Sequence, residues 1–293
     1  MHFASVHPRR RFNVPLPNGR SLALGDRTVI MGVVNVTPDS FSDGGLLLDA
    51  GAAIDAGVRM AEQGAGILDV GGESTRPGAS AIDEAEERRR VIPVIEGLAR
   101  RVDIPISVDT YKAGTADAAL AAGASIVNDI SGLRYDPALA GVVARRGAAV
   151  VLMHTRGRSS DMYQQASYDD VVAEVLDELR ESIAFATGAG VDRERILVDP
   201  GLGFAKEARH SFEALARLAD FRELARPLVV GPSRKSFLDK ALGGHVPAPE
   251  RDWATAAAVA AAVLAGAHVA RVHSVSAMRQ VVRVADEIRR YAR

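Results

Sequence analysis

Polar side chains recur at the ends of short apolar runs along the whole chain. A single one of them could cap the following helix or close a turn, but a buried series of polar and ionised groups is too costly without a common role. If the run ends meet at one edge of a fold, they form a cleft with hydrogen-bond donors and acceptors, which suits a flat, polar heterocycle. The groups at the eight run ends are Asn35, Asp69 with Glu73, Asp109, Asn128 with Asp129, His154, Asp199, Ser233 with Lys235, and Arg271 with His273.

The residue types indicate how such a heterocycle would be read. One carboxylate, that of Asp109 or Asp199, can accept hydrogen bonds from a ring N–H and from an adjacent exocyclic amino group. Asn128 can serve a neighbouring donor and acceptor together. Lys235 can donate to a carbonyl oxygen and a ring nitrogen, so the four side chains together can match the whole edge of the ring.

Groups suited to anions stand at the last run and in a glycine-rich segment. Arg271 and His273 alternate on the last run, so both point the same way, toward an anion such as phosphate or toward the face of a ring. The segment GGESTRPG, 71–78, combines hydroxyls, an arginine and glycines, as in a mobile anion-binding loop. The segment VVNVTPDSFSDGG, 33–45, turns from an apolar run to hydroxyls, carboxylates and paired glycines, which suits neither a core strand nor a helix.

Several kinds of chemistry are disfavoured by what the sequence lacks. It contains no phosphate loop of the form G-x-x-x-x-G-K-[ST], no dinucleotide-binding G-x-G-x-x-G and no G-x-S-x-G nucleophile elbow. The seven histidines show no metal-binding spacing and there are no cysteines, so zinc is not expected, although oxygen-rich loops can hold magnesium through the phosphates of a substrate. Lysine plus arginine number 36 against 37 aspartate plus glutamate, so neither nucleic acid nor a membrane surface is an expected partner.

The eight apolar runs predict the elements that position these groups. Continuous apolar runs, each followed by an amphipathic helical stretch, are typical of parallel strands buried on both faces and joined by right-handed crossovers. Eight such units predict an α/β fold of the (β/α)8 TIM barrel type, with the polar run ends together at its C-terminal rim. A doubly wound open sheet is the alternative, because strand count alone does not show closure. The runs are 29–36, 66–72, 104–110, 125–131, 148–154, 195–201, 226–233 and 268–275.

The remaining segments predict one domain, 1–293, with an N-terminal tail and hairpin in 1–27. Residues 12–26 alternate around Asn18–Gly19, which indicates a β-hairpin, and we expect it to cap the bottom of the barrel. The alanine-rich stretch 254–270 is interrupted by Gly266 and His268, so it predicts a buried helix running into a strand rather than a membrane span. The N-terminus lacks the apolar segment of a signal peptide, and the absence of cysteine is compatible with the expected cytoplasmic location.

Seven segments, in chain order, resemble the motifs of dihydropteroate synthase, a folate-pathway enzyme. The resemblance covers all eight predicted barrel units and implies a transferase that condenses 6-hydroxymethyl-7,8-dihydropterin pyrophosphate with p-aminobenzoate. The products are 7,8-dihydropteroate and pyrophosphate, formed by dissociative substitution at the pterin methylene carbon. The resemblance further implies Mg²⁺ as cofactor, a homodimer built on the last helices, and a sulfonamide target. The segments are NVTPDSFSDGG (35–45), DVGGESTRPG (69–78), SVDT (107–110), VNDISG (127–132), DPGLGF (199–204), GPSRKSF (231–237) and RVH (271–273).

The resemblance also implies roles for individual residues. The pterin is expected to contact Asp109, Asn128, Met153, Asp199, Phe204, Lys235 and Arg271. Pyrophosphate is expected at Asn35, Thr75, Arg76, Arg271 and His273, and the expected protein ligand of Mg²⁺ is Asn35. p-Aminobenzoate is expected beside Phe41, Pro77, Lys235 and Ser236. The residues expected to take part in catalysis are Asp43, Lys235, Arg271, His273 and Asn35. The loop with Phe41 and Asp43 is expected to close over the bound pyrophosphate.

Two other functions stay open at this point. A pterin-binding methyltransferase domain would share the barrel and part of the pterin site, but this chain shows no cobalamin partner domain. A catalytically silent pterin-binding paralogue is the other alternative, and its support is Ser274, which stands where the family usually has aspartate. Release of pyrophosphate that requires p-aminobenzoate would distinguish the synthase from both.

Overall fold

A parallel sheet of eight strands forms the centre of the computed structural model, which describes residues 6–36, 46–74 and 78–292. The strands lie in the spatial order β8-β7-β6-β5-β4-β3-β10-β9. Each predicted apolar run therefore contains one strand. Their bounds are β3 (Val29–Asn35), β4 (Ile67–Gly71), β5 (Ile106–Asp109), β6 (Ile126–Asp129), β7 (Ala149–Met153), β8 (Ile196–Asp199), β9 (Val229–Val230) and β10 (Val269–Val272).

Contacts between the two edge strands close this sheet into a barrel. Val198 of β8 forms a parallel bridge with Leu228, the residue that precedes β9. The amide of Val198 also donates a hydrogen bond of 3.0 Å to the carbonyl oxygen of Pro227. A doubly wound sheet would leave these two edges apart, so the predicted (β/α)8 TIM barrel is confirmed and the open sheet is wrong.

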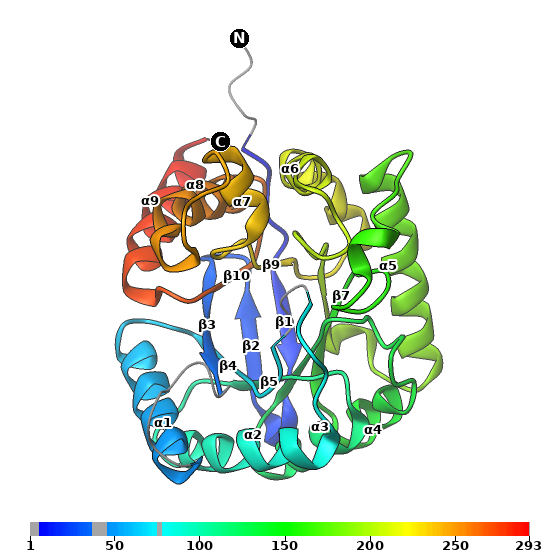
Figure 1. Cartoon of the computed structure of the whole chain (residues 1–293), viewed down its shortest axis with the longest axis vertical. Coiled ribbons are helices and arrows are strands. Elements are labelled where there is room, and N and C mark those ends of the chain that lie inside the picture. The colour runs from blue at the N-terminus through cyan, green and yellow to red at the C-terminus, as the bar shows by residue number, and fades with distance from the viewer. Residues whose placement is uncertain (1–5, 37–45, 75–77, 293) are drawn as a thin grey trace.

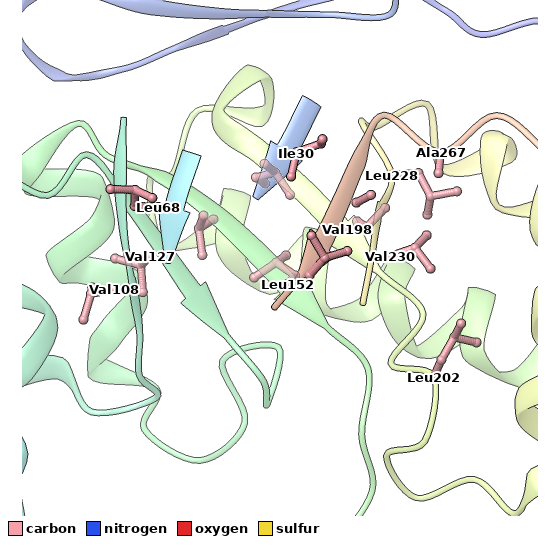
Figure 2. Close-up of a cluster of buried hydrophobic side chains, with 14 of the residues drawn as sticks. Ile30, Leu68, Val108, Val127, Leu152, Val198, Leu202, Leu228, Val230 and Ala267 are labelled. Carbon is pink, nitrogen blue, oxygen red and sulfur yellow. The ribbon is translucent and has the colours of Figure 1, made fainter. Parts of the chain in front are cut away.

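Helices surround the barrel and bury the outward face of its strands (Figure 1). Ile30, Leu68, Val108 and Leu152 point outward and belong to the larger buried apolar cluster, part of which Figure 2 shows. Burying each such side chain contributes about 1.5–3 kcal/mol. The helices are α1 (Leu46–Glu62), α2 (Glu84–Ala99), α3 (Ala113–Ala121), α4 (Ala138–Arg146), α5 (Val171–Gly188), α6 (Ala208–Ala216), α7 (Ser236–Ala241), α8 (Asp252–Leu264) and α9 (Val275–Tyr291).

Aspartate side chains explain where two of the helices begin. Asp83 accepts a hydrogen bond from the amide of Glu86 and caps α2, and Asp170 caps α5 in the same way. The alanine-rich stretch forms α8 and then β10, as predicted. Within the described residues, every helix is too short or too polar to cross a bilayer.

The N-terminal hairpin seals one end of the barrel. Strands β1 (Phe12–Pro15) and β2 (Ser21–Leu24) pair antiparallel, and Asn18 and Gly19 adopt the positive φ angles that the tight turn requires. Val14 and Leu22 of the hairpin pack against the inward side chains at the N-terminal ends of the strands. The predicted cap is confirmed, and it leaves the C-terminal end of the barrel for a binding site. The inward side chains in this second cluster include Met31, Ile67, Ile126, Val151, Leu197, Val229 and Val269.

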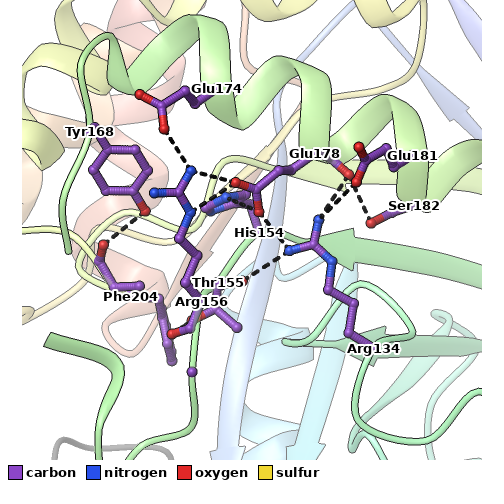
Figure 3. A network of polar contacts seen from close by, with 12 residues as sticks. Arg134, His154, Thr155, Arg156, Tyr168, Glu174, Glu178, Glu181, Ser182 and Phe204 are labelled. Atoms are coloured by element: carbon purple, nitrogen blue, oxygen red, sulfur yellow. Dashed lines mark hydrogen bonds and ion pairs between the residues drawn. The ribbon is translucent and has the colours of Figure 1, made fainter. Parts of the chain in front are cut away.

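A polar cluster on the outside of the barrel, which we call the Glu178 cluster, joins α5 to the loops after β6 and β7 (Figure 3). Glu178 accepts hydrogen bonds of 2.7 Å from Arg134 and 2.8 Å from Nε of Arg156, and lies 3.2 Å from Nε2 of His154. On the other side of the imidazole, Lys206 donates to Nδ1 of His154 over 2.8 Å. Burial and the nearby ammonium of Lys206 lower the pKa of His154 to about 3, so the neutral ring donates from Nε2. The cluster, with Lys206 from the loop after β8, therefore ties four segments together.

Replacing Glu178 with glutamine should destabilise the fold by about 2 kcal/mol, because Arg134 would lose its close counter-charge and Arg156 would keep only Glu174. Although burial opposes ionisation, hydrogen bonds from His154 and Arg156 hold the pKa of Glu178 below its ordinary value. The stabilisation is therefore complete well above pH 4.5 and declines as the pH falls. Urea unfolding at pH 7 and pH 4 measures both effects.

The matched control is Glu181→Gln on the same helix. Glu181 is 76% exposed and lies 4.0 Å from Arg134, so its replacement should change the free energy of unfolding by less than about 0.5 kcal/mol. Equal effects of the two substitutions would contradict the assigned role of Glu178.

Candidate active site

A charged network at the C-terminal end of the barrel is built around Arg271 of β10. Its Nε donates to Oδ2 of Asp69 and its Nη2 donates to Oδ2 of Asp109, both over 2.6 Å. Nδ2 of Asn128 donates to the same oxygen of Asp69 over 3.0 Å. Side chains of β4, β5, β6 and β10 are thereby joined inside the barrel.

Strand register explains why these groups meet. Asp109 pairs with Asn128 on one side and with Gly71 on the other, so both polar side chains lie at the same level of the barrel. Asp69 lies two residues before Gly71 and therefore points inward as well. It is fully buried, and its Oδ1 has no hydrogen-bond partner among the described residues. In the sequence Asp69 stands out only as a polar run end, whereas its alternation with the inward-pointing Ile67 places it inside the barrel.

The network shifts the ionisation of its members. Burial raises the pKa of Asp109 to about 7; Arg271 opposes this rise and the negative charge of Asp69 adds to it. Burial also opposes the charge of Arg271, but Asp69 and Asp109 outweigh it and hold the pKa of the guanidinium above its usual value. Arg271 therefore stays charged, and it compensates two carboxylates in a place with little water.

A second group of side chains surrounds Lys235, which immediately precedes α7. Its Nζ donates a short hydrogen bond to the carbonyl oxygen of Leu202 and lies 4.4 Å from the ring centroid of Phe204. Burial lowers the pKa of Lys235 to about 8, with Asp199 opposing this shift and Arg271 adding to it. The charges of Arg271 and Asp109 act on Lys235, so the two groups lie within electrostatic range of each other.

The loop after β8 depends on two glycines in the DPGLGF motif. Gly201 has φ +68°, and a Cβ there would lie 1.9 Å from the carbonyl oxygen of His154. Its amide donates to Oδ1 of Asp199 over 2.7 Å, which fixes that carboxylate. Gly203 has φ +79°, and a Cβ there would come within 3.1 Å of Cδ of Lys235. Glycine at both positions lets the chain pass close to the site.

The structure brings the predicted pterin residues to one end of the barrel. Met153 is buried at the end of β7 and pairs with Asp199. Arg271 joins Asp109 directly and Asn128 through Asp69, and Lys235 lies over Phe204. Their contact with a pterin stays a prediction.

The expectation that every polar run end lines one cleft is wrong for Asp129 and His154. Asp129 is directed away from the barrel axis and accepts hydrogen bonds from Ser131 and from the amide of Leu133. It closes a turn, which is the structural role that a single polar run end can have. His154 belongs to the Glu178 cluster on the outside.

Asn35 and His273 stand at the ends of neighbouring strands, β3 and β10. The side chain of Asn35 is exposed at the rim. Nδ1 of His273 lies 2.9 Å from Oγ of Ser233, and the amide of His273 donates to the same oxygen over 3.2 Å. The loop between β9 and α7 therefore fixes the position of His273.

Ser274, the departure from the family pattern, has a carboxylate beside it from another element. Asp252 at the start of α8 accepts two hydrogen bonds from Arg234, of 2.8 and 3.0 Å. These bonds lower the pKa of Asp252, and a hydrogen bond with Ser274 and the charge of His273 act in the same direction. A negative group is thus present near His273 without an aspartate at position 274.

Five predicted site residues lie outside the described residues: Phe41, Asp43, Thr75, Arg76 and Pro77. The described segment just before residue 75 is firmly anchored. Glu73 accepts hydrogen bonds of 2.6 Å from Lys112 and 2.8 Å from the hydroxyl of Tyr111. Beyond residue 77, the amide of Gly78 donates to the carbonyl oxygen of Ser159 over 3.0 Å. Both ends of this short segment are therefore held at the rim.

The donor set limits how a metal ion could bind. Across residues 6–36, 46–74 and 78–292, no three His, Asp or Glu side chains converge as a metal cage. The exposed carboxamide of Asn35 offers one oxygen at the rim. This arrangement fits Mg²⁺, which usually takes one or two protein ligands and completes its shell with water and substrate phosphates.

A closed (β/α)8 barrel with a charged, hydrogen-bonding C-terminal mouth defines the class of TIM-barrel enzymes. The profile of the family described as "Pterin binding enzyme" matches residues 31–273. Dihydropteroate synthase of Synechocystis is 44% identical over 278 residues, which cover 94% of this chain and 96% of that protein.

Solved structures give the same result. Xanthomonas albilineans dihydropteroate synthase with 4-aminobenzoic acid is 45% identical, with a TM-score of 0.86 over 94% of this chain and 98% of that one. The Yersinia pestis enzyme in complex with a sulfonamide drug is 37% identical, with a TM-score of 0.89 over 95% and 100% of the two chains. This chain belongs to the dihydropteroate synthase family of pterin-binding enzymes.

Binding of the predicted pterin ligand should weaken by about tenfold between pH 8 and pH 9.5. The ammonium form of Lys235 donates a stronger hydrogen bond to the pterin than the neutral amine does, and its lowered pKa of about 8 places the loss of that charge in this interval. Isothermal titration calorimetry with 6-hydroxymethyl-7,8-dihydropterin measures the affinity across the range. In Lys235→Met the affinity should be weaker at pH 7 and nearly constant to pH 9.5. The same decline in both proteins would assign it to the ligand or to another group.

Proposed function

We propose that this chain is a transferase that condenses 6-hydroxymethyl-7,8-dihydropterin pyrophosphate with p-aminobenzoate to give 7,8-dihydropteroate and pyrophosphate. The observation that carries the proposal is the hydrogen-bonded network of Arg271, Asp69, Asp109 and Asn128 at the C-terminal end of the barrel, with Lys235 in electrostatic range of it. The similarity to the Synechocystis dihydropteroate synthase covers 94% of this chain and 96% of that enzyme, so the shared region includes nearly all of the relative.

The donors and acceptors of the site match those of a pterin. The carboxylate of Asp199 can accept from a ring N–H and the exocyclic amino group, while Lys235 donates to the carbonyl oxygen. Asp109 and Asn128 serve the other ring edge. Arg271 holds Asp109 at a fixed distance, and such preorganisation lowers the entropy lost on binding.

Charge balance at the site favours a dissociative reaction. The C–O bond between the methylene carbon and pyrophosphate breaks with its electron pair on the leaving group, which leaves a cation conjugated with the dihydropterin. The neutral amine of p-aminobenzoate then forms the C–N bond and releases a proton. When ionised, Asp69 and Asp109 carry one more charge than Arg271 compensates, so the pterin end of the site is negative and stabilises the developing cation.

The opposite charge is needed at the leaving group. Among the described residues, Asp69 and Asp109 bind Nε and Nη2 of Arg271, and we infer that Nη1 donates to a phosphate oxygen. We infer that His273 and Asn35 contact the pyrophosphate at the adjacent strand ends. Magnesium held by Asn35 and the phosphate oxygens would neutralise charge on the leaving group. We also propose that Asp43 takes part in catalysis from the loop that is predicted to close over the pyrophosphate.

The test is a coupled pyrophosphate-release assay with the dihydropterin pyrophosphate and Mg²⁺. Release should require p-aminobenzoate, yield dihydropteroate and stop when a chelator removes the metal. Asp109→Ala should lower kcat/KM by at least about a hundredfold, because it removes a pterin acceptor and leaves Arg271 only partly compensated. Pterin binding without any release of pyrophosphate would contradict the synthase and favour the silent paralogue.

We also propose a homodimer in the cytoplasm. The last helix, α9, exposes an apolar strip in which Val284, Ile288 and Tyr291 are 63%, 49% and 80% exposed. Because the chain belongs to the dihydropteroate synthase family, we propose that a second copy of the chain packs against this strip. The cytoplasmic location rests on the absence of cysteine and on the place of the reaction in folate biosynthesis.

Ile288→Glu should convert the dimer into a monomer of about 31 kDa, because it places a charge in the centre of the apolar strip. Sedimentation velocity at micromolar concentration measures the mass. Phe185→Glu on α5, where the phenylalanine is 46% exposed, is the control and should stay dimeric. A wild-type protein of monomeric mass would contradict the dimer itself.

A further inference from the structure

Tyr163, on the loop after β7, reaches the part of the rim where p-aminobenzoate is expected. Its hydroxyl oxygen lies 3.3 Å from the carbonyl oxygen of Gly203 and 3.3 Å from Oγ of Ser236. The side chain is 42% exposed, so one side of it remains open to a ligand. Tyr163 lies outside the seven motifs of the sequence.

The loop that carries Tyr163 has a defined structure. Met162, the preceding residue, is 2% exposed and anchors the short 3₁₀ turn Met162–Gln165. Asp161 accepts a hydrogen bond of 2.6 Å from the amide of Arg158, and the amide of Gln164 donates to the carbonyl oxygen of Asp161 over 2.9 Å. The tyrosine therefore projects from a fixed turn toward Ser236.

Tyr163 connects three loops around Lys235. Gly203 lies between Leu202, whose carbonyl oxygen accepts from Lys235, and Phe204, whose ring lies under the ammonium group. Ser236 follows Lys235 directly. A single hydroxyl on the loop after β7 thus lies within reach of the loop after β8 and of the first residue of α7.

Hydrogen-bond counting shows what this hydroxyl can offer. Gly203 supplies only a carbonyl acceptor, so Tyr163 donates its one proton there and can accept from the hydroxyl of Ser236. At 3.3 Å both contacts are long, and they cost little to exchange for shorter bonds. An ionised carboxylate beside Ser236 is a stronger acceptor than either present partner, and both hydroxyls can turn toward it.

We propose that Tyr163 is a specificity residue that, together with Ser236, binds the carboxylate of p-aminobenzoate. This inference rests on the proposed function, and it assigns to the tyrosine the preference for a charged carboxylate over a neutral group at the same ring position. Hydroxyl donors bind a carboxylate more strongly than an ester or a sulfonamide, because the acceptor carries a full charge. The tyrosine takes no part in loss of pyrophosphate, so it should affect KM rather than kcat.

The experiment compares wild type with Tyr163→Phe for two amine substrates, p-aminobenzoate and methyl 4-aminobenzoate. The substitution removes one hydroxyl and keeps the ring. The KM for p-aminobenzoate should rise about five- to tenfold with kcat nearly unchanged, while the KM for the neutral ester stays within about twofold. The control is Phe185→Leu at a 46% exposed aromatic residue on α5, which should leave both values unchanged.

Two outcomes would overturn the proposal. An unchanged KM for p-aminobenzoate removes the contact, and an equal rise for acid and ester makes Tyr163 a structural residue of the rim. The proposed function is judged separately, by whether wild type forms dihydropteroate at all. If it does not, calorimetric binding of p-aminobenzoate to protein saturated with a pterin and pyrophosphate still tests the tyrosine. Equal affinity of wild type and Tyr163→Phe then rejects its role.

Discussion

The ion pairs of Arg271 with Asp69 and Asp109 are the constraint on which the rest of the site depends. The three residues come from strands separated by 202 and 162 positions in the sequence, and only the barrel brings them within 2.6 Å. Each carboxylate would be an uncompensated buried charge without the guanidinium, at a cost of several kcal/mol. The interior can hold these charges because each of them has a partner. Arg271 donates to one oxygen of each carboxylate, and Asn128 donates to the same oxygen of Asp69.

Barrel closure and the hairpin determine which end of the barrel holds these charges. β10 pairs with β3, so Arg271 extends past β3 to reach β4 and β5 inside the barrel. At the other end, Val14 and Leu22 of the hairpin pack on the inward apolar side chains. Alternate side chains of each strand point into the barrel. Near the hairpin these inward side chains are mainly valine, leucine and isoleucine, and toward the C-terminal strand ends they are aspartate, asparagine and arginine. The barrel interior is therefore apolar at the hairpin end and charged at the other.

The sequence predicts the eight strands and the barrel end that carries the site from continuous apolar runs with polar ends, and it predicts the hairpin from the alternation around Asn18–Gly19; all of these are local patterns. It predicts less well which polar residues face inward. Asn128 and Met153 point into the barrel, so Asp129 and His154, each one residue further on, point away from it. A polar residue at a run end looks the same in the sequence whichever way it points. Strict alternation along the strand distinguishes the inward residue from its outward neighbour. The contact between Tyr163 and Ser236 joins two loops 73 residues apart, and no local pattern encodes it.

The Glu178 cluster outside the barrel also supports the site within it. Lys206 is fully buried, and burial lowers its pKa to about 7, with Asp199 opposing the shift. Its Nζ donates to Nδ1 of His154 over 2.8 Å and to the carbonyl oxygen of Phe204 over 3.2 Å. The ring of that same phenylalanine lies under Lys235. The backbone of Phe204 is thus held by Lys206 on one side while its ring lies under Lys235 on the other, so a buried amine outside the barrel positions the surface against which the substrate would lie.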